Sequence, residues 1–189
     1  MSITKSNAIN PREWVGSHAD YLYAFAVARV NDEELARDLV QETFLAALER
    51  IEKFEGRSSE RTWLTAILKH KVMDVYRKRS SSLSSVRVDG VGEDRDYFES
   101  GNGHWKEEHL PRAFGIEQYD QLASKEFENI LRQCMKKLPP LWVSVFTMKH
   151  IDDLGTEVIC GHLKLSSSNF WVIIHRAKVN LRACLQKNW

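Results

Sequence analysis

Hydrophobic residues recur at intervals of three and four along most of the chain, which predicts amphipathic helices, and no convincing strand alternation interrupts them. In residues 31–56, one such stripe predicts the core-facing side of a helix: Ala36, Val40, Phe44, Ala47, Leu48 and Ile51. Asn31 with Glu34 predicts a capping box at its start, and Gly56 predicts its end near Phe54.

Two further helices are predicted on either side of this one. Asn10 followed by Pro11 is typical of a helix start, with proline at the first helical position. The third helix begins near Arg61 and ends in a basic cluster followed by serines. Its apolar side chains are expected to face inward: Leu64, Ile67, Leu68, Val72 and Val75.

The helical period is lost over residues 81–121, where glycines and acidic residues accumulate, and it returns at residue 122. Four helices are expected after that point, the second of which begins at a pair of prolines. The predicted fold class is therefore all-α, with two small helical domains, 10–80 and 122–189, joined by a long flexible linker over 81–121.

The last two helices have the layout of a helix-turn-helix. A short helix over residues 156–163 is followed by a turn at Lys164 and Leu165, and Ser166 is placed to cap a longer helix. Lys164 stands where glycine would relieve a left-handed backbone. A helical hairpin without any DNA-binding role would show the same pattern, so this alternative stays open.

The start of the longer helix carries small polar side chains, which suit contacts with DNA. Ser167, Ser168 and Asn169 lie at its positive end, where backbone N–H groups bind phosphate and asparagine can reach a base edge. The next four residues, 171–174, are apolar, and helical phasing cannot bury all of them. An exposed Trp171 would favour apolar contacts, such as those with thymine methyl groups.

Residues 31–56 also present a second ridge, on a different face from the core stripe. Its members follow helical spacing and are acidic or polar around one apolar residue: Asp38, Gln41, Glu42, Leu45 and Glu49. A leucine in such surroundings is hard to explain by the protein's own core.

Composition narrows the function classes only slightly. The 189 residues carry a net charge of +1, so bulk charge alone predicts no nucleic-acid partner, and the distribution of charge matters more. No apolar run of membrane-spanning length and no signal sequence is found, so no membrane insertion is expected. Cys134, Cys160 and Cys184 are widely spaced, which predicts buried, reduced thiols in a cytoplasmic protein.

The third helix is the most basic stretch of the chain and the second candidate for nucleic-acid binding. Its cations could neutralise phosphates, and Trp63 and Tyr76 could stack on unpaired bases. The basic residues are Lys69, Lys71, Arg77, Lys78 and Arg79. The alternative is a solvated helix end whose cations favour its negative terminus.

Three stretches together resemble a known family. "ARDLVQETFLAALERIEKFEG" and "RTWLTAILKHKVMDVYRKR" resemble region two of bacterial sigma factors of the extracytoplasmic-function (ECF) group. "LPPLWVSVFTMKHIDDLGTEVICGHLKLSSSNFWVIIHRAKVNLRACL" resembles their region four. The resemblance covers about residues 20–79 and 122–186, and it implies a protein without covalent chemistry, cofactor or metal that gives RNA polymerase its promoter specificity.

The resemblance implies a role for each group of residues. The acidic ridge would dock on the β′ coiled coil of core RNA polymerase, whose β subunit is also an expected partner. The −10 promoter element would be bound and melted by Lys53, Phe54, Arg57, Trp63, Lys69, His70, Asp74, Arg77 and Lys78. The loop over 53–57 would capture a flipped base, while Trp63 is either a core or a base-contacting residue.

Region four would place its longer helix in the major groove of the −35 element. The implied contacts come from Ser167, Ser168, Asn169, Trp171, His175, Arg176 and Lys178. The family often has polar or basic residues over 171–173, so the apolar run departs from its pattern. The linker resembles the segment that the family threads through the polymerase, and an anti-sigma factor is a further partner that the resemblance implies.

Three other functions are alternatives to this one. A stand-alone helix-turn-helix regulator would explain the C-terminal half but not "DLVQETF" or the basic helix. A degenerate paralogue would bind polymerase without reading a promoter. An enzyme is disfavoured because His18, His104, His109 and His162 lack metal-ligand spacing and no nucleophile lies beside a base.

Overall fold

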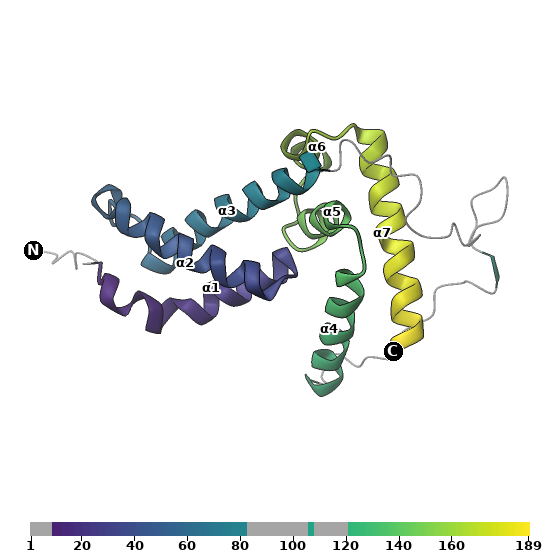
Figure 1. Cartoon of the computed structure of the whole chain (residues 1–189), viewed down its shortest axis with the longest axis horizontal. Coiled ribbons are helices and arrows are strands. Elements are labelled where there is room, and N and C mark those ends of the chain that lie inside the picture. The colour runs from purple at the N-terminus through teal and green to yellow at the C-terminus, as the bar shows by residue number, and fades with distance from the viewer. Residues whose placement is uncertain (1–8, 83–105, 108–120) are drawn as a thin grey trace, which may run out of the picture.

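The computed structural model describes residues 9–82, 106–107 and 121–189, and its regular elements there are all helical (Figure 1). The first group of helices consists of η1 (Pro11–Glu13), α1 (Trp14–Val30), α2 (Glu33–Glu49), η2 (Ile51–Lys53) and α3 (Glu60–Ser82). The second consists of α4 (Gln121–Lys136), α5 (Pro140–His150), α6 (Thr156–Leu163) and α7 (Ser167–Asn188). The predicted all-α class with two helical groups is confirmed, while most of the predicted linker lies outside the described residues.

The first helical residue is Pro11, as predicted, but the first turn is a 3-10 helix rather than an α-helix. Asn10 makes no side-chain cap, and a 3-10 turn precedes α1, which begins at Trp14. Glu60, at the start of α3, holds this entry in place, because its carboxylate accepts from the Asn10 backbone N–H at 2.8 Å and from Trp14 Nε1 at 3.1 Å. The chain entry is therefore fixed by a residue some fifty positions away.

The predicted capping box between α1 and α2 is wrong by one residue. Asn31 ends α1 in a left-handed conformation (φ 54°), which asparagine tolerates better than most residues. Asp32 caps α2 instead, its carboxylate accepting from the backbone N–H groups of Glu34 and Leu35 at 3.1 Å. Asn31 therefore ends α1, and the next residue, Asp32, is the cap at which α2 begins.

The core-facing side of α2 also differs from the prediction. Leu48 is 48% exposed, whereas Thr43 is fully buried. The Thr43 hydroxyl donates to the Leu39 carbonyl at 2.7 Å, which satisfies its polarity inside the helix. The helix ends at Glu49 rather than near Phe54, and Gly56 (φ +69°) lies in the loop that follows η2.

Helix α3 crosses the first group and buries Leu64, Leu68 and Val72 as predicted. Tyr76 is buried as well, so the expectation that it is available to stack on a base is wrong. Its hydroxyl donates to the Arg29 carbonyl at 3.2 Å. Burial, aided by the negative charge of Asp152, raises the pKa of the Tyr76 phenol above its ordinary value.

The two helical groups pack against each other, which the sequence does not reveal. The C-terminal end of α3 reaches α6, and α5 lies beside α1 and α3 (Figure 1). Polar contacts also cross the junction: the Asn31 side chain donates to the Arg132 carbonyl at 3.3 Å, and the Ser80 hydroxyl donates to the Leu163 carbonyl. The described residues therefore form a closed arrangement with one continuous apolar core.

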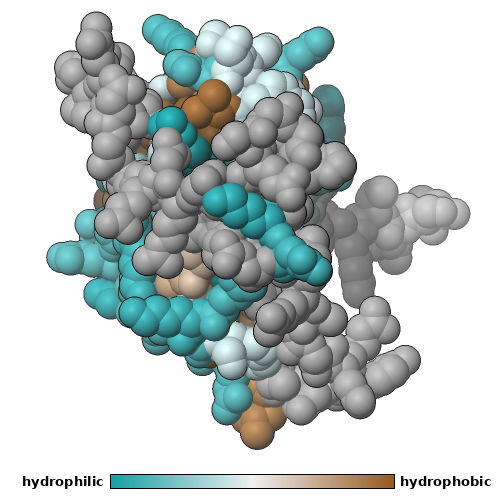
Figure 2. All heavy atoms as spheres, turned by 90° about the vertical axis from the view of Figure 1, so that its right-hand side faces the viewer, coloured by the Kyte–Doolittle hydropathy of each residue, from teal (hydrophilic) through white to brown (hydrophobic). Residues whose placement is uncertain are grey.

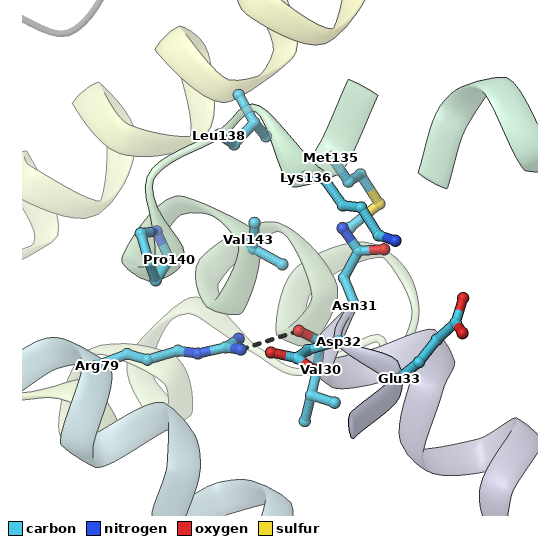
Figure 3. A pocket seen from close by; sticks show the side chains of 10 residues that line it. All are labelled: Val30, Asn31, Asp32, Glu33, Arg79, Met135, Lys136, Leu138, Pro140 and Val143. Carbon is cyan, nitrogen blue, oxygen red and sulfur yellow. Dashed lines mark hydrogen bonds between the residues drawn. The ribbon is translucent and has the colours of Figure 1, made fainter. Parts of the chain in front are cut away.

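A cleft of about 380 Å³ marks this junction (Figure 3). Arg79 reaches into it from α3 and donates to the Val30 carbonyl at 2.9 Å. Burial lowers the pKa of the Arg79 guanidinium, although Tyr76 and Asp32 oppose the change. The second helical group lines the cleft with Met135, Lys136, Leu138, Pro140 and Val143, and the α1–α2 junction lines it with Val30, Asn31, Asp32 and Glu33.

The C-terminal group contains the predicted helix-turn-helix with the predicted bounds. Lys164 adopts the left-handed conformation (φ 54°, ψ 42°) that the sequence places in the turn. Ser166 caps α7, its hydroxyl accepting from the Asn169 backbone N–H at 3.2 Å. Phe170, buried one turn into α7, helps to fix this helix on the core.

The cysteines correct another prediction. Cys134 of α4 and Cys184 of α7 form a disulfide, with their Cα atoms 5.8 Å apart, while Cys160 is free and half-buried. The prediction of three reduced thiols fails because the two partners are 50 residues apart in sequence yet lie on helices that pack side by side.

Candidate polymerase and nucleic-acid interfaces

The acidic ridge on α2 is a solvent-facing surface. All five of its members are exposed: Asp38, Gln41, Glu42, Leu45 and Glu49. Leu45 is 61% exposed, and Leu48, which the core stripe was expected to bury, lies exposed on the same helix. The Glu42 carboxylate is 3.0 Å from the Lys71 ammonium, which ties one edge of the ridge to α3. Exposed leucines among carboxylates suit a protein partner with apolar and basic side chains.

The loop between α2 and α3 rests on an aromatic support. Phe54 is half-buried, with its ring centroid 5.1 Å from that of Trp63. Trp63 in turn packs edge-on against Trp14 at 6.1 Å. Lys53 and Arg57 are exposed, and Arg57 lies 2.7 Å from the carboxylate of Glu55. Trp63 thus combines a packing role with partial exposure beneath the loop.

One face of α3 presents the candidate −10 residues to solvent. Lys69, His70, Asp74, Arg77 and Lys78 are all exposed. Arg77 pairs with Asp74 at 2.7 Å, but both side chains are more than half exposed, so the pair stabilises the helix little.

Two of the five cations that make α3 basic in sequence lie elsewhere. Lys71 is bound to Glu42 of α2, and Arg79 points into the junction between the helical groups. The basic face available to nucleic acid is therefore narrower than the sequence indicates.

The start of α7 forms a second exposed face. Ser168, Trp171, His175 and Lys178 follow spacings of three and four residues, so they lie along one side of the helix and all are exposed. Ser167 and Asn169 are exposed beside them, while Arg176 is half-buried.

The apolar run in α7 divides between core and surface. Ile173 and Ile174 are buried, whereas Trp171 is 59% and Val172 is 44% exposed. The Trp171 ring packs edge-on against the buried Phe170, with centroids 5.2 Å apart, which restricts how it can move. The prediction that the core could not hold all four residues is confirmed.

His150, at the end of α5, adds a titratable group near this face. Burial lowers the pKa of its imidazole, and the positive charges of Lys178 and Lys149 lower it further, while Asp153 opposes them. The ring also packs on Phe146, with centroids 4.7 Å apart. The neutral imidazole is therefore the favoured form beside Lys178.

On the face that Figure 2 shows, hydrophobic atoms emerge in small, separate areas among hydrophilic ones. Within the described ranges, no group of His, Cys, Asp and Glu side chains could hold a metal ion. No helix there has the length and apolarity needed to cross a bilayer.

Comparison with known proteins gives a consistent assignment. The family model described as Sigma-70 region 2 matches residues 14–82. A probable RNA polymerase sigma factor of Haemophilus influenzae is 34% identical over 88% of this chain and 84% of its own length. The RNA polymerase sigma factor YlaC of Bacillus subtilis is 29% identical over 94% and 90%.

One further relative covers less of the chain, and one solved structure is similar at low sequence identity. The ECF RNA polymerase sigma factor SigC of Mycobacterium tuberculosis is 53% identical over 46% of each chain. The sigma factor RpoE of Bartonella quintana, solved in complex with the anti-sigma factor NepR, covers 93% of this chain and 96% of its own at 20% identity. The TM-score is 0.44, a value too low to establish a common arrangement of the helices.

The chain belongs to the family of RNA polymerase sigma factors, and within it to the ECF type. It is a sigma factor that directs RNA polymerase in transcription initiation, and it is not an enzyme.

Proposed function

We propose that the two helical groups divide the work of promoter recognition. Residues 10–80 act as region two, which binds core RNA polymerase and the −10 element, and residues 122–189 act as region four, which reads the −35 element. Residues 81–121 connect them. The observation that carries this proposal is the solvent-exposed acidic ridge around Leu45, which does not pack into the protein's own core.

The ridge serves as the docking surface for the β′ subunit. Leu45 supplies apolar area that is already exposed, so burying it against a partner is favourable. Asp38 and Glu49 at its margins favour a partner surface with basic side chains. This charge complementarity attracts the partner and also fixes its orientation on the ridge. The β subunit contacts the rest of the assembled factor.

The loop over 53–57 and the exposed face of α3 bind the −10 element. Flipping a base out of the stack costs a few kcal/mol, and ring contacts can offset part of this cost. Phe54 and Trp63 are half-buried, so they present ring surface already held in place. Lys69 and Lys78 neutralise phosphates of the adjacent strand.

The start of α7 reads the −35 element in the major groove. Ser167 and Ser168 lie at the positive helix end, where they favour phosphate, and Asn169 reaches a base edge. Between these polar residues and Lys178, Trp171 and Val172 present apolar surface. Such surface suits the methyl groups of thymine.

Promoter binding requires the closed arrangement to open. The Ser80–Leu163 hydrogen bond holds the C-terminal end of α3, which carries Lys78, against α6, which directly precedes α7. The −10 and −35 elements lie about 25 base pairs, or about 85 Å, apart along B-DNA. One chain reaches both elements only when the two groups have separated.

An anti-sigma factor fits this picture as a regulator. A protein that binds both helical groups in the closed arrangement would keep them from separating and would cover the exposed ridge. Because the factor works on chromosomal promoters with RNA polymerase, its place of action is the cytoplasm.

Co-purification with core RNA polymerase tests the proposal. Leu45→Ala combined with Asp38→Lys should reduce the retained fraction at least ten-fold, because it removes the apolar centre and reverses a charge. The matched control is Leu122→Ala combined with Asp20→Lys, which changes an exposed leucine and an exposed aspartate away from the ridge. Equal retention of both variants would refute the docking surface.

Run-off transcription on genomic fragments then separates the rival functions. A sigma factor starts transcription with core polymerase alone, and the mapped start sites give both promoter elements. A stand-alone regulator would do neither, and a degenerate paralogue would co-purify without initiating.

A further inference from the structure

Helices α4 and α7 pack along each other, and the disulfide bond links the two helices at one point of their interface. Cys134 is almost fully buried in this interface, whereas Cys184 is half-buried and lies nearer the surface. The free thiol, Cys160, is on α6 and takes no part in this bond. At the far end of the interface, the rings of Phe127 and Trp189 meet edge-on at 5.5 Å.

The surroundings of the two sulfurs differ in charge. The Lys137 ammonium is 3.7 Å from Cys184 Sγ, and the Asn188 amide nitrogen is 3.6 Å from the same atom. A disulfide sulfur is a weak acceptor, but a thiolate is a strong one, and a nearby cation stabilises it. The donors therefore favour Cys184 as a thiolate when the bond is reduced.

We propose that Cys134 and Cys184 are a peroxide-reactive dithiol, with Cys184 as the attacking and Cys134 as the resolving residue, whose reversible oxidation clasps α4 onto α7. The Cys184 thiolate attacks the O–O bond of a hydroperoxide, forms a sulfenic acid and releases water or an alcohol. The Cys134 thiol then loses its proton and attacks that sulfur, which expels the hydroxyl as water. Two thiols and one hydroperoxide thus give one disulfide, one alcohol or water, and one water.

The clasp acts on the helix that carries the candidate −35 residues. The bond closes a chain segment that contains α5, α6 and all but the last turn of α7, so oxidation restricts the unfolded form of the whole helix-turn-helix. The oxidised chain is thus the more heat-resistant one. This inference needs only the thiols and the helix pair, so it stands or falls apart from the proposed promoter contacts.

The test measures thiols in the full-length reduced protein after a brief exposure to hydrogen peroxide. Mass spectrometry after alkylation should show that two of the three thiols are lost, as a peptide linking Cys134 to Cys184 that dithiothreitol cleaves. Cys160→Ser is the matched control and should form the same bond. Oxidation of Cys160 while Cys134 and Cys184 stay alkylated would overturn the proposal.

Two variants test the separate roles. Cys134→Ser should stop the reaction at a sulfenic acid on Cys184 that dimedone traps, whereas Cys184→Ser should give no such adduct on Cys134. Lys137→Gln should slow peroxide oxidation several-fold, whereas Lys136→Gln, its exposed neighbour, should not. Equal rates for the two lysine variants, or a trapped adduct on Cys134, would contradict the assigned roles.

The thermal midpoint of the C-terminal helices provides an independent readout. Oxidation should raise it by about 10 °C in the wild-type chain and in Cys160→Ser, and by nothing measurable in Cys134→Ser. An unchanged midpoint in the oxidised wild-type chain would show that the bond does not act as a clasp.

Discussion

Arg29 of α1 and Asp152, just after α5, form a buried ion pair between the two helical groups. The Arg29 Nη2 and Asp152 Oδ1 atoms are 2.7 Å apart, and Arg29 Nε is 2.9 Å from the same oxygen. Only 15% of the arginine and 6% of the aspartate side chain is exposed. Arg29 also stacks on Phe25, 3.5 Å above the ring centroid, so the guanidinium is held in place from both sides.

Loss of this pair should open the closed arrangement. Asp152→Asn leaves the Arg29 charge without its counter-ion, and breaking such a buried pair costs about 3–5 kcal/mol. Because separation of the groups returns Arg29 to water, we expect a larger radius of gyration in small-angle scattering with unchanged helix content. Asp153→Asn is the control, since Asp153 is exposed and asparagine tolerates its left-handed backbone (φ 51°). Identical scattering from the two variants would show that the pair does not hold the groups together.

Lys178 should contribute one ionic contact to promoter binding. In the holoenzyme, Lys178→Ala is expected to weaken binding similarly for all −35 sequences and to reduce the salt dependence of affinity by about one ion. Lys187→Ala, which removes an exposed cation from the last turn of the same helix, should leave the slope unchanged. Affinities measured over a range of salt concentrations decide between the two outcomes.

His150 should titrate below its ordinary pKa of 6.5, because burial and the charges of Lys178 and Lys149 disfavour the imidazolium. The unfolded chain then binds the proton more readily than the folded one. The contribution of His150 to stability is therefore complete above about pH 6.5 and is lost as the pH falls through the folded pKa. NMR titration of the ring should give a midpoint under 6.5 that rises in Lys178→Ala. A midpoint at or above 6.5 would contradict the assigned causes.

Tyr76 should stabilise the fold through its hydroxyl as well as its ring. Tyr76→Phe removes the donor to the Arg29 carbonyl and leaves that acceptor without it, which should lower the free energy of unfolding by about 1–2 kcal/mol. Tyr23→Phe, at a half-buried position of α1, is the comparison and should cost less. Urea denaturation of both variants would show the difference, and equal midpoints would argue against a role for the hydroxyl.

Local patterns in the sequence were sufficient for much of the fold. The helix-turn-helix was predicted residue by residue, because Ser166 caps and Lys164 turns according to short-range rules. The ridge around Leu45 could be recognised because its residues follow helical spacing on a face other than the core stripe, yet include an apolar leucine among acidic and polar residues. In both cases the information lies within one or two turns of helix.

Features that depend on distant residues could not be predicted in this way. Nothing near Arg29 in the sequence indicates Asp152, and nothing near Cys134 indicates Cys184, because each pair forms only when the helices have packed. Tyr76 was expected to be available for base stacking because hydropathy does not show that a distant backbone carbonyl accepts a hydrogen bond from its hydroxyl. One sequence taken alone does not show which distant positions are in contact.

The junction between α3 and α6 has a consequence for assembly in the cell. If most free molecules are closed, only the open minority can span a promoter, and the apparent affinity of the factor for its polymerase is reduced by that minority's fraction. Small changes at the Ser80–Leu163 contact would then change how well the factor competes with other sigma factors for polymerase. No atom that touches polymerase or DNA would need to change.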